Sequence, residues 1–360
     1  MVNTDKTDVI QFRNKNRVKS GFNFQFDGVA LNIVEKYKYL GTVFSEHLDY
    51  DVTSSMLAGA AGRALGGVIS KFKALKNVGY HTFYKMFHSS VVPIIDYASG
   101  VWGYKNSNAG DKIQFRAVRY YLGVHLKAAL LALEGDIGWN TCKMRQHINM
   151  IRLWNRMIKM EDNRLTKRVF KWDYQLCKNW CFDLKQILFS VQLQPIYEEM
   201  DVCNIRVHEG KLKEQRIIHW RECLPLKPKL RTYMTFKDSI NTEDYVKYCS
   251  YRKRMSLLAQ LRIGILPIHV ETGRFRNKKL EERVCFICNN NEIENEVHFV
   301  CVCSVYLQFR ENLFQKVVNV NDFNFMSDED KLIYLMNFHW KDLSVYVEKA
   351  WDKRNNILYK

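Results

Sequence analysis

Residues 283–303 read RVCFICNNNEIENEVHFVCVC, and four of them follow the pattern Cys-x2-Cys-x9-His-x4-Cys: Cys285, Cys288, His298 and Cys303. Thiolates and imidazoles in sets of four are the ligands that zinc prefers. A short turn presents the first pair, and a second segment brings back the other two. Because four protein ligands leave no position for water or substrate, the pattern predicts a structural Zn²⁺ site.

Two alternatives to this ligand set stay open at the level of spacing. The chain has ten cysteines, and a free cysteine packs as a small hydrophobe, so the group could be a buried thiol cluster. Cys301 is also a rival fourth ligand. If residues 298–303 are extended, Cys301 and Cys303 share one face and His298 lies on the other, so alternation does not choose between them.

The charge of the chain is strongly uneven. The formal net charge is +17, yet from residue 283 onward nine Lys and Arg stand against eleven Asp and Glu. Residues 1–282 therefore carry +19, and the predicted zinc region is not the basic one. A field of this size favours a polyanion as partner, and nucleic acid is the commonest.

Length and composition describe a globular protein. The chain has 360 residues, of which 47% are hydrophobic, enough for two or three domains with their own cores. The start has no apolar signal segment, and no window approaches eighteen apolar residues. We therefore expect an intracellular protein, nuclear or cytoplasmic, with no membrane partner and with reduced or metal-bound cysteines.

The hydrophobic patterns predict a mainly α protein of several parts. Residues 1–45 favour short antiparallel strands, and Asp27-Gly28 is typical of a tight hairpin turn. From about residue 54 the pattern becomes helical, and the glycines there suggest close packing against a neighbour. Pro225 and Pro228 indicate a linker or loop within residues 200–250. Helices are expected over residues 56–75, 81–93, 109–122, 144–160, 251–264, 305–318 and 343–358.

Several stretches share an order that is familiar from one family. VNTDKTDVIQF and EKYKYLGTVFS open the chain, PIIDYASGVWG and RYYLGV follow, and LAQLRIGILPIHVETGRF leads into the Cys/His segment. Within that segment the matching residues are Glu296, His298, Phe299, Cys303 and Tyr306. Together these stretches resemble the C-terminal part of reverse transcriptases encoded by non-LTR (LINE-type) retrotransposons, and the resemblance favours Cys303 over Cys301.

The resemblance implies four consecutive regions. They are a palm-edge β segment with a primer-grip-like hairpin (residues 1–50), a helical thumb-like bundle (51–135), a basic helical linker region (136–265) and a zinc-binding end with flanking helices (266–360). Polymerases of this family hold magnesium on clustered aspartates that include a Tyr-x-Asp-Asp turn. This chain has no Tyr-x-Asp-Asp, so we expect no catalytic residues and no polymerase activity of its own.

Two groups of basic residues are the candidates for binding nucleic acid. The first basic set is Lys36, Lys38, Arg63, Lys71, Lys73 and Lys76, with Tyr39 and Gly41 beside it on the predicted hairpin. The second basic set is Arg252, Lys253, Arg254, Arg262 and Arg274. Such cations meet phosphates as point charges, which gives salt-dependent and sequence-tolerant binding.

The sequence thus predicts a reverse transcriptase-like protein that binds RNA, DNA or their hybrid. A polymerase part encoded separately upstream is a further candidate partner. Two alternatives differ in class. One is a zinc-stabilised helical scaffold that binds proteins, which the acidic flanks of the Cys/His segment favour. The other is a decaying reading frame of a mobile element without a selected role.

Overall fold

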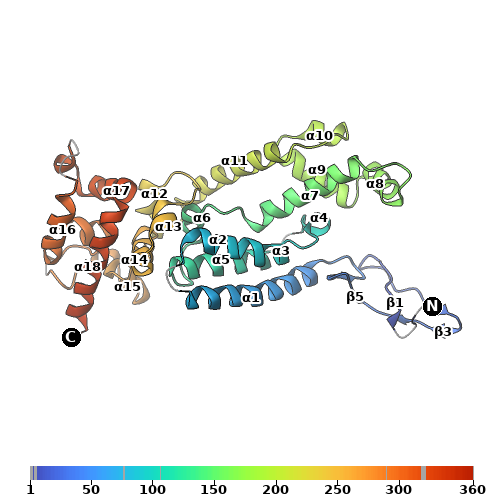
Figure 1. Cartoon of the computed structure of the whole chain (residues 1–360), viewed down its shortest axis with the longest axis horizontal. Coiled ribbons are helices and arrows are strands. Elements are labelled where there is room, and N and C mark those ends of the chain that lie inside the picture. The colour runs from blue at the N-terminus through green and yellow to red at the C-terminus, as the bar shows by residue number, and fades with distance from the viewer. Residues whose placement is uncertain are drawn as a thin grey trace. The chain divides into compact units, whose positions relative to one another are not determined.

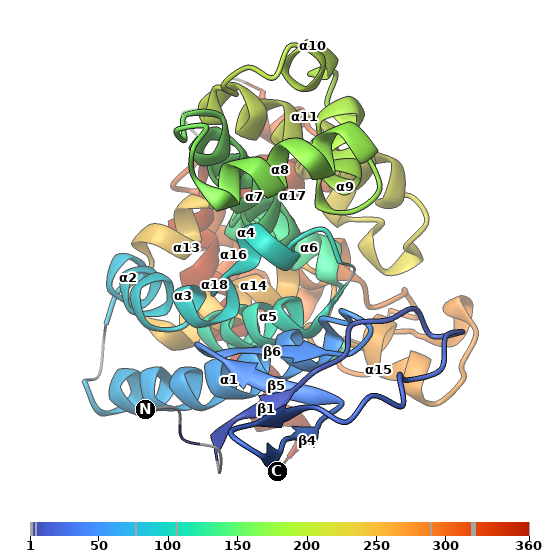
Figure 2. The same cartoon turned by 90° about the vertical axis from the view of Figure 1, so that its right-hand side faces the viewer.

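The computed structural model describes residues 3, 6–75, 78–105, 107–288, 290–317 and 322–359 (Figures 1 and 2). It is mainly helical, and the strands lie within the first 45 residues. Among the described residues, no helix is both long and apolar enough to cross a membrane.

The chain forms two compact units, each assembled from separated segments. The first unit comprises Met1–Gly67, His88–Gln114 and Asn140–Leu212, and the second comprises Val68–Phe87, Phe115–Trp139 and Lys213–Lys360. The four consecutive regions expected from the sequence do not coincide with these units. Segments that are distant in the sequence pack into the same unit, and some single helices contribute residues to both units.

The N-terminal strands form three short pairs. Strands β2 (Gln25–Phe26) and β3 (Val29–Ala30) pair antiparallel, and φ is positive at both turn residues, Asp27 and Gly28. The predicted tight turn is therefore confirmed. Strand β1 (Asp8–Val9), however, pairs parallel with β4 (Asn32–Ile33), which differs from the all-antiparallel expectation. The long connection between β1 and β4 permits this, since parallel strands cannot be joined by a tight turn.

The hairpin of β5 (Lys36–Tyr39) and β6 (Thr42–Ser45) is fixed on the first unit by polar contacts. Thr53 Oγ1 accepts a 3.0 Å bond from the Val43 amide and donates a 2.8 Å bond to the Val43 carbonyl. At the turn, Tyr97 donates a 2.7 Å hydrogen bond to the Leu40 carbonyl. A Cβ on Gly41 would lie 3.2 Å from the Tyr97 ring, and φ there is +82°, so the turn requires glycine.

Helices make up the rest of the first unit. The core is built on the apolar stripe of α7, where Trp154 stacks on Tyr197 at 5.6 Å and donates to the Asp201 carbonyl at 2.8 Å. The stripe predicted over residues 144–160 is thus a core face. The helices are α3 (Val92–Ile95), α4 (Ser99–Trp102), α7 (Cys142–Ile158), α8 (Leu165–Leu176), α9 (Trp180–Ser190) and α10 (Gln194–Glu198).

Four helices contribute residues to both units: α1 (Asp51–Ala74), α2 (Tyr80–Ser90), α5 (Ala109–Leu122) and α11 (Ile205–Cys223). Helix α5 has the bounds that the sequence predicts. The loop that Pro225 and Pro228 indicate lies after α11, where residues 224–227 are not helical and η2 (Pro228–Leu230) is a short helical turn. The sequence analysis did not predict α11 itself. Its charged residues spread around the helix and hide the apolar periodicity that would have indicated it.

The second unit holds the C-terminal helices. Its α-helices are α2 (Tyr80–Ser90, through Phe87), α6 (Leu130–Ile137), α12 (Tyr233–Phe236), α13 (Asp244–Tyr248), α14 (Arg252–Arg262), α15 (His269–Phe275), α16 (Leu307–Phe314), α17 (Asp328–Phe338) and α18 (Trp340–Leu358). Short turns of other helix types are η2 (Pro228–Leu230), η3 (Leu280–Glu282), η4 (His298–Val302), η5 (Ser304–Tyr306) and η6 (Phe323–Phe325).

Candidate metal centre and basic surfaces

A short hairpin presents the first two cysteines of the Cys/His cluster. The Cys285 amide donates to the Glu292 carbonyl at 2.8 Å, and the Glu294 amide donates to the Arg283 carbonyl at 2.9 Å. These bonds close the chain on itself, with Cys285 and Cys288 on the outgoing side. The two thiols are thereby held on one turn, as the Cys-x2-Cys spacing predicts.

The second pair comes from one helical turn and not from an extended segment. Residues 298–302 form the π-helical turn η4, and the Cys303 amide donates to the His298 carbonyl at 2.8 Å. This bond spans five residues, as in π-helices, and returns Cys303 to the side of His298. The alternation of an extended chain, which left the choice of fourth ligand open, therefore does not apply.

The structure brings together one ligand atom each from Cys285, Cys288, His298 and Cys303, all within 4.8 Å of one another. His298 Nε2 lies 3.5 Å from Cys288 Sγ. Cys285, His298 and Cys303 are buried, and Cys288 is partly exposed. This group could hold a metal ion.

Cys301 lies outside the group, although it is also buried. Burial raises the pKa of its thiol to about 12, but it is the position of its sulfur outside the group that separates Cys301 from the four. The fourth member of the cluster is Cys303.

An outer carboxylate orients the imidazole of the cluster. His298 Nδ1 lies 2.9 Å from a Glu292 carboxylate oxygen. Since the carboxylate accepts, Nδ1 carries the proton and Nε2 is left to face the sulfurs. A histidine that donates its second nitrogen to a carboxylate is the usual arrangement around bound metal. Glu292 was not singled out from the sequence, where the acidic stretch between the ligands was its only signal.

The thiols share negative charge. A hydrogen bond from Cys303 lowers the pKa of the Cys285 thiol far below its ordinary range, against the effect of burial. The same bond raises the pKa of Cys303. One sulfur is therefore a thiolate while its neighbour keeps a proton. A cation among them would replace such protons, which is how metal binding and thiol ionisation are coupled.

Buried ionic contacts anchor the cluster to the helices around it. The Glu294 carboxylate pairs with the Arg354 guanidinium of α18 and accepts from the His269 amide of α15 at 2.7 Å. Burial raises the pKa of Glu294 to about 7, although Arg354 opposes the shift. Removal of either partner would leave the other charge buried and unpaired. The cluster thus joins three parts of the second unit's C-terminal segment.

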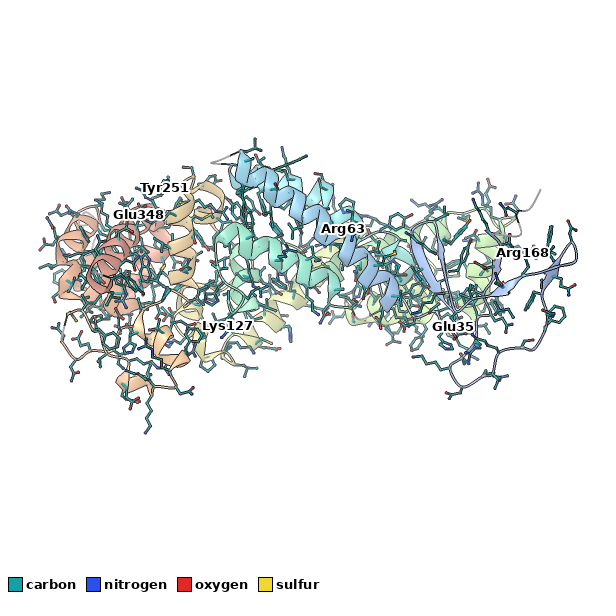
Figure 3. All side chains as sticks on the ribbon, turned by 90° about the horizontal axis from the view of Figure 1, so that it is seen from below. Glu35, Arg63, Lys127, Arg168, Tyr251 and Glu348 are labelled. Carbon is teal, nitrogen blue, oxygen red and sulfur yellow. The ribbon has the colours of Figure 1, made fainter. Side chains whose placement is uncertain are left out.

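The first basic set is exposed. Lys36 and Lys38 lie on β5 beside Tyr39, which is 58% exposed. Arg63 is exposed on the part of α1 that belongs to the first unit (Figure 3). Lys71 and Lys73 are exposed near the end of that helix, in the second unit. Within the part of the chain that the structure describes, none of these five cations has an acidic partner; Lys76 lies outside it.

The cations of the second basic set form ion pairs or aromatic contacts within the second unit. Arg254 pairs with Glu348 at 2.7 Å and Lys253 pairs with Asp352 at 2.7 Å, so both tie α14 to α18; Figure 3 labels Glu348 beside Tyr251. Arg252 lies over the Tyr120 ring at 4.7 Å. Arg274 pairs with Glu271 at 3.4 Å.

The structure corrects the prediction that Arg262 contacts nucleic acid. Its side chain is 1% exposed, pairs with Asp136 at 3.3 Å and with Glu243 at 3.0 Å, and donates to the Met336 carbonyl. A guanidinium in this position cannot reach a phosphate. Its charge instead balances the buried Asp136 carboxylate, which also accepts hydrogen bonds from two tyrosines. Arg262 is a core residue.

None of the known protein-family models, curated proteins or solved structures matches this chain. The likeness to reverse transcriptases therefore stays a hypothesis that rests on the motifs themselves.

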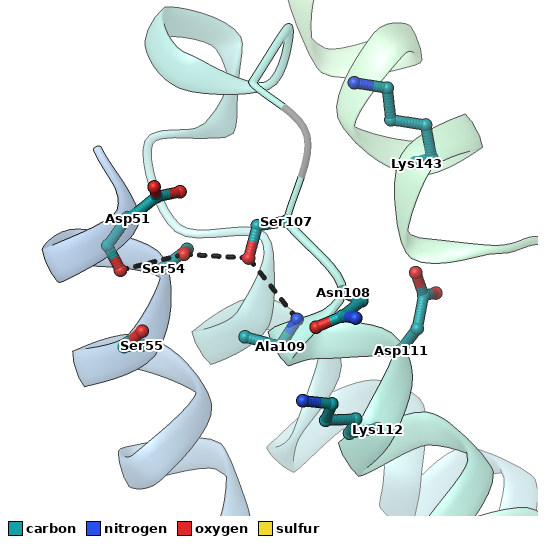
Figure 4. A pocket seen from close by; sticks show the side chains of 9 residues that line it. All are labelled: Asp51, Ser54, Ser55, Ser107, Asn108, Ala109, Asp111, Lys112 and Lys143. Atoms are coloured by element: carbon teal, nitrogen blue, oxygen red, sulfur yellow. Dashed lines mark hydrogen bonds between the residues drawn. The ribbon is translucent and has the colours of Figure 1, made fainter. Parts of the chain in front are cut away.

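A pocket of about 600 Å³ opens in the first unit where α1 and α5 begin (Figure 4). Ser54 and Ser107 share a 2.9 Å hydrogen bond across it, and the Ala109 amide donates to Ser107 Oγ at 3.3 Å. Asp51 and Asp111 also line it, opposite Lys112 and Lys143. Ser107, near the start of α5, is already hydrogen-bonded within the chain, and both acidic and basic side chains line the pocket. No ligand class is therefore favoured in this pocket.

Proposed function

We propose that this protein binds nucleic acid, either an RNA–DNA hybrid or another duplex, through the first-unit members of the first basic set, Lys36, Lys38 and Arg63, and that it is related to the C-terminal part of non-LTR reverse transcriptases. The proposal rests on the difference in ion pairing between the two basic sets. Cations of the β5–β6 hairpin and of α1 are exposed without acidic partners among the described residues, so their charge is available to phosphates.

The exposed face of α1 supports the same proposal. In the first unit, exposed positions recur every four residues at Asp51, Ser55, Gly59, Arg63 and Gly67. A glycine inside a helix costs about 1 kcal/mol relative to alanine. Yet a Cβ on Gly67 would meet nothing within 4 Å, and one on Gly59 only the end of Arg63. The expected packing of these two glycines against a neighbour inside the chain is absent from the described residues, so the flat face is open to a close approach from outside.

The binding mode follows from the residue types. Lysines and an arginine on a strand and a helix face contact phosphates and carry no base specificity. Tyr39 and Gly41 at the hairpin turn offer an exposed ring and a backbone without a side chain. We therefore expect affinity to depend steeply on salt and little on sequence.

The test of the proposal is a salt titration with a fluorescent RNA–DNA hybrid of about 20 base pairs, measured by anisotropy. A linear fall of log affinity with log salt, with a slope of several units, is expected. A hybrid of a second, unrelated sequence serves as the control for sequence tolerance. Absence of binding at low salt would refute the proposal.

We further propose that the cluster of Cys285, Cys288, His298 and Cys303 holds Zn²⁺ as a structural ion. Three thiols and one imidazole form a closed tetrahedral set for zinc, and the Glu292 contact fits an outer carboxylate. When bound, the ion would fix the hairpin and η4 to each other. Because no ligand position stays open, it would not supply catalysis.

Metal content tests this assignment with a matched pair of variants. Cys303→Ala should lower the zinc measured by plasma mass spectrometry well below one equivalent, and Cys301→Ala should leave it near one. Each substitution removes a buried thiol that lies within five residues of His298. A difference in zinc content between the two variants therefore reports metal ligation and not loss of packing. Equal zinc content in the two variants would contradict the ligand set.

The expected lack of polymerase activity stays a prediction. Primer extension by this chain with magnesium and deoxynucleotides should give no product, because the sequence has no Tyr-x-Asp-Asp turn. Robust extension would show that this interpretation of the motifs is wrong.

A second candidate function is a protein-binding scaffold, and α8 favours it. Leu165, Val169, Trp172 and Leu176 are exposed at helical spacing and form an apolar stripe. Exposed Arg164 and Arg168 flank it (Figure 3), so an acidic amphipathic helix is the partner that fits. Tryptophan fluorescence during titration with such a peptide tests this candidate. A response that disappears in Trp172→Phe, with hybrid binding absent, would favour the scaffold.

A further inference from the structure

A basic and aromatic stretch lies at the end of α15, and only its first residue, Arg274, belongs to a set described above. Residues 274–279 read RFRNKK, four cations around one phenylalanine. Helix α15 ends at Phe275, and Asn277 adopts the left-handed conformation with φ of 52°. The Lys278 amide donates back to the Gly273 carbonyl at 3.0 Å. The stretch is thus a defined turn that carries its side chains outward.

Phe275 forms one wall of an apolar pocket of about 470 Å³. It is 57% exposed, and Leu126, from the loop after α5, is 82% exposed. Ile265 and Pro267 complete the apolar walls. Lys127, labelled in Figure 3, places its ammonium 4.8 Å from the Phe275 ring. Large apolar side chains exposed together are unusual on a protein surface and mark binding sites.

The charge around this pocket is positive and available. The side chains of Arg276, Lys278 and Lys279 form no ion pair among the described residues, and the Lys279 main-chain amide donates to the Glu282 carboxylate at 2.9 Å. The acid in the pocket lining, Glu271, is neutralised by its pairs with Lys229 and Arg274. Lys278 also lies 5.5 Å from the ring of Phe286, which is half exposed. Cations therefore surround two exposed aromatic rings.

The turn is held in place by the residue that starts the Cys/His segment. The Arg283 guanidinium donates to the Lys278 carbonyl at 2.6 Å and to the Val270 carbonyl at 3.0 Å. Its aliphatic part fills the space beside Gly273, where a Cβ would lie 2.6 Å from it. The turn is therefore positioned before any ligand binds, which lowers the entropic cost of binding.

We propose that this turn and pocket form a binding site for single-stranded nucleic acid, distinct from the surface of the first basic set. An unpaired base stacks on Phe275 and enters the apolar pocket, while Arg276, Lys278 and Lys279 contact the flanking phosphates. A duplex does not fit, because its bases are already stacked and paired. Exposed aromatics interleaved with cations are the general means of binding single strands. The inference rests on the proposed function in assuming a nucleic-acid partner.

The experiment uses the full chain and two fluorescent probes, a 12-nucleotide oligo(dT) strand and the RNA–DNA hybrid of the salt titration above, with blunt ends. Phe275→Ala should weaken binding of the single strand about fivefold to a hundredfold, the usual loss for one stacked base. Phe275→Tyr should retain it, because the ring face remains. Binding of the hybrid should be unchanged in both variants. Circular dichroism checks that the fold is intact.

A second pair of variants separates charge from stacking. Joint replacement of Arg276, Lys278 and Lys279 by alanine should reduce the salt slope for the single strand by about two units of log affinity per log salt, and Phe275→Ala should leave that slope unchanged. Joint replacement of Lys36, Lys38 and Arg63 should reduce the slope for the hybrid instead.

The outcomes distinguish this inference from the proposed function. Hybrid binding without single-strand binding, or single-strand binding that Phe275→Ala leaves intact, overturns the inference and leaves the proposed function standing. Binding of neither probe overturns both. Equal loss of both probes in Phe275→Ala also overturns the inference, because one shared surface would then serve both. Capture of an acidic peptide at the pocket in preference to oligo(dT) would assign the site to a protein partner and overturn the inference.

Discussion

Both basic sets are candidates for phosphate contacts in the sequence, and they have opposite structural roles. Lys36, Lys38 and Arg63 are exposed with no acidic partner among the described residues, whereas Lys253, Arg254 and Arg262 each pair with a carboxylate. The partners of Lys253, Arg254 and Arg262 include acids that lie 99, 94 and 126 residues away in the sequence. A count of charges along the sequence therefore measures how much positive charge exists, but not how much of it a partner can use.

The degree of burial separates the members of the second set further. Arg262 is enclosed, and its charge is matched by Asp136 and Glu243. Lys253 and Arg254 pair at the surface, where solvent and salt screen the attraction. Within α14, one basic residue therefore lies in the core, while two others form weak ion pairs at the surface.

The largest expected effect is on Arg262. Arg262→Met should lower the free energy of unfolding by about 3–5 kcal/mol, because Asp136 would be left buried without its cation. Urea denaturation measures the loss, with Lys73→Met, an exposed and unpaired position, as the matched control at near zero. A loss below about 1 kcal/mol would contradict the structural role of this residue.

The second effect concerns binding. Joint replacement of Lys36, Lys38 and Arg63 by alanine should reduce the salt slope for an RNA–DNA hybrid by about 0.9 for each phosphate that the protein no longer neutralises. The paired residues Lys253 and Arg254, replaced together, provide the comparison and should leave the slope unchanged. If the slope falls equally in the two variants, the distinction between free and paired cations has no functional meaning.

The third effect concerns the stability of the surface pairs. Arg254→Ala should lower the free energy of unfolding by about 0.2–1 kcal/mol, since its bond to Glu348 is partly exposed. The loss should shrink further at about 1 M salt, where charges are screened over about 3 Å. A double-mutant cycle with Glu348→Gln isolates the pair, and a coupling energy of zero would show that the pairing is incidental.

The smallest effect has the opposite sign. Gly59→Ala on the exposed face of α1 should raise the free energy of unfolding by about 0.5–1 kcal/mol, because alanine favours the helix and nothing opposes its methyl group. Gly59→Leu should weaken hybrid binding while keeping the fold. Unchanged affinity in Gly59→Leu would show that no ligand approaches this face closely.

Local signals were predictable from the sequence, and pairings over long distances were not. Helix α5 and the turn at Asp27-Gly28 follow from periodicity and turn chemistry, and Cys285, Cys288 and His298 follow from their spacing. The choice of Cys303 over Cys301 did not follow from spacing and was favoured only by the resemblance. The burial of Arg262 could not be predicted, because its partner Asp136 lies 126 residues earlier. The π-helical turn η4 was not predicted, because its five residues have high β propensity and favour a strand. Only the placement of His298 and Cys303 in one cluster requires a turn there.

The interleaved composition of the two units has a consequence for how the chain is made and cut. The chain passes between the units five times, and the last segment of the first unit ends only at Leu212. A nascent chain therefore cannot complete either unit from its first hundred residues, and no single stretch of sequence, expressed alone, contains one whole unit and nothing of the other. Deletion mapping by truncation would remove pieces of both at once, so point substitutions are the appropriate tool for assigning roles in this protein.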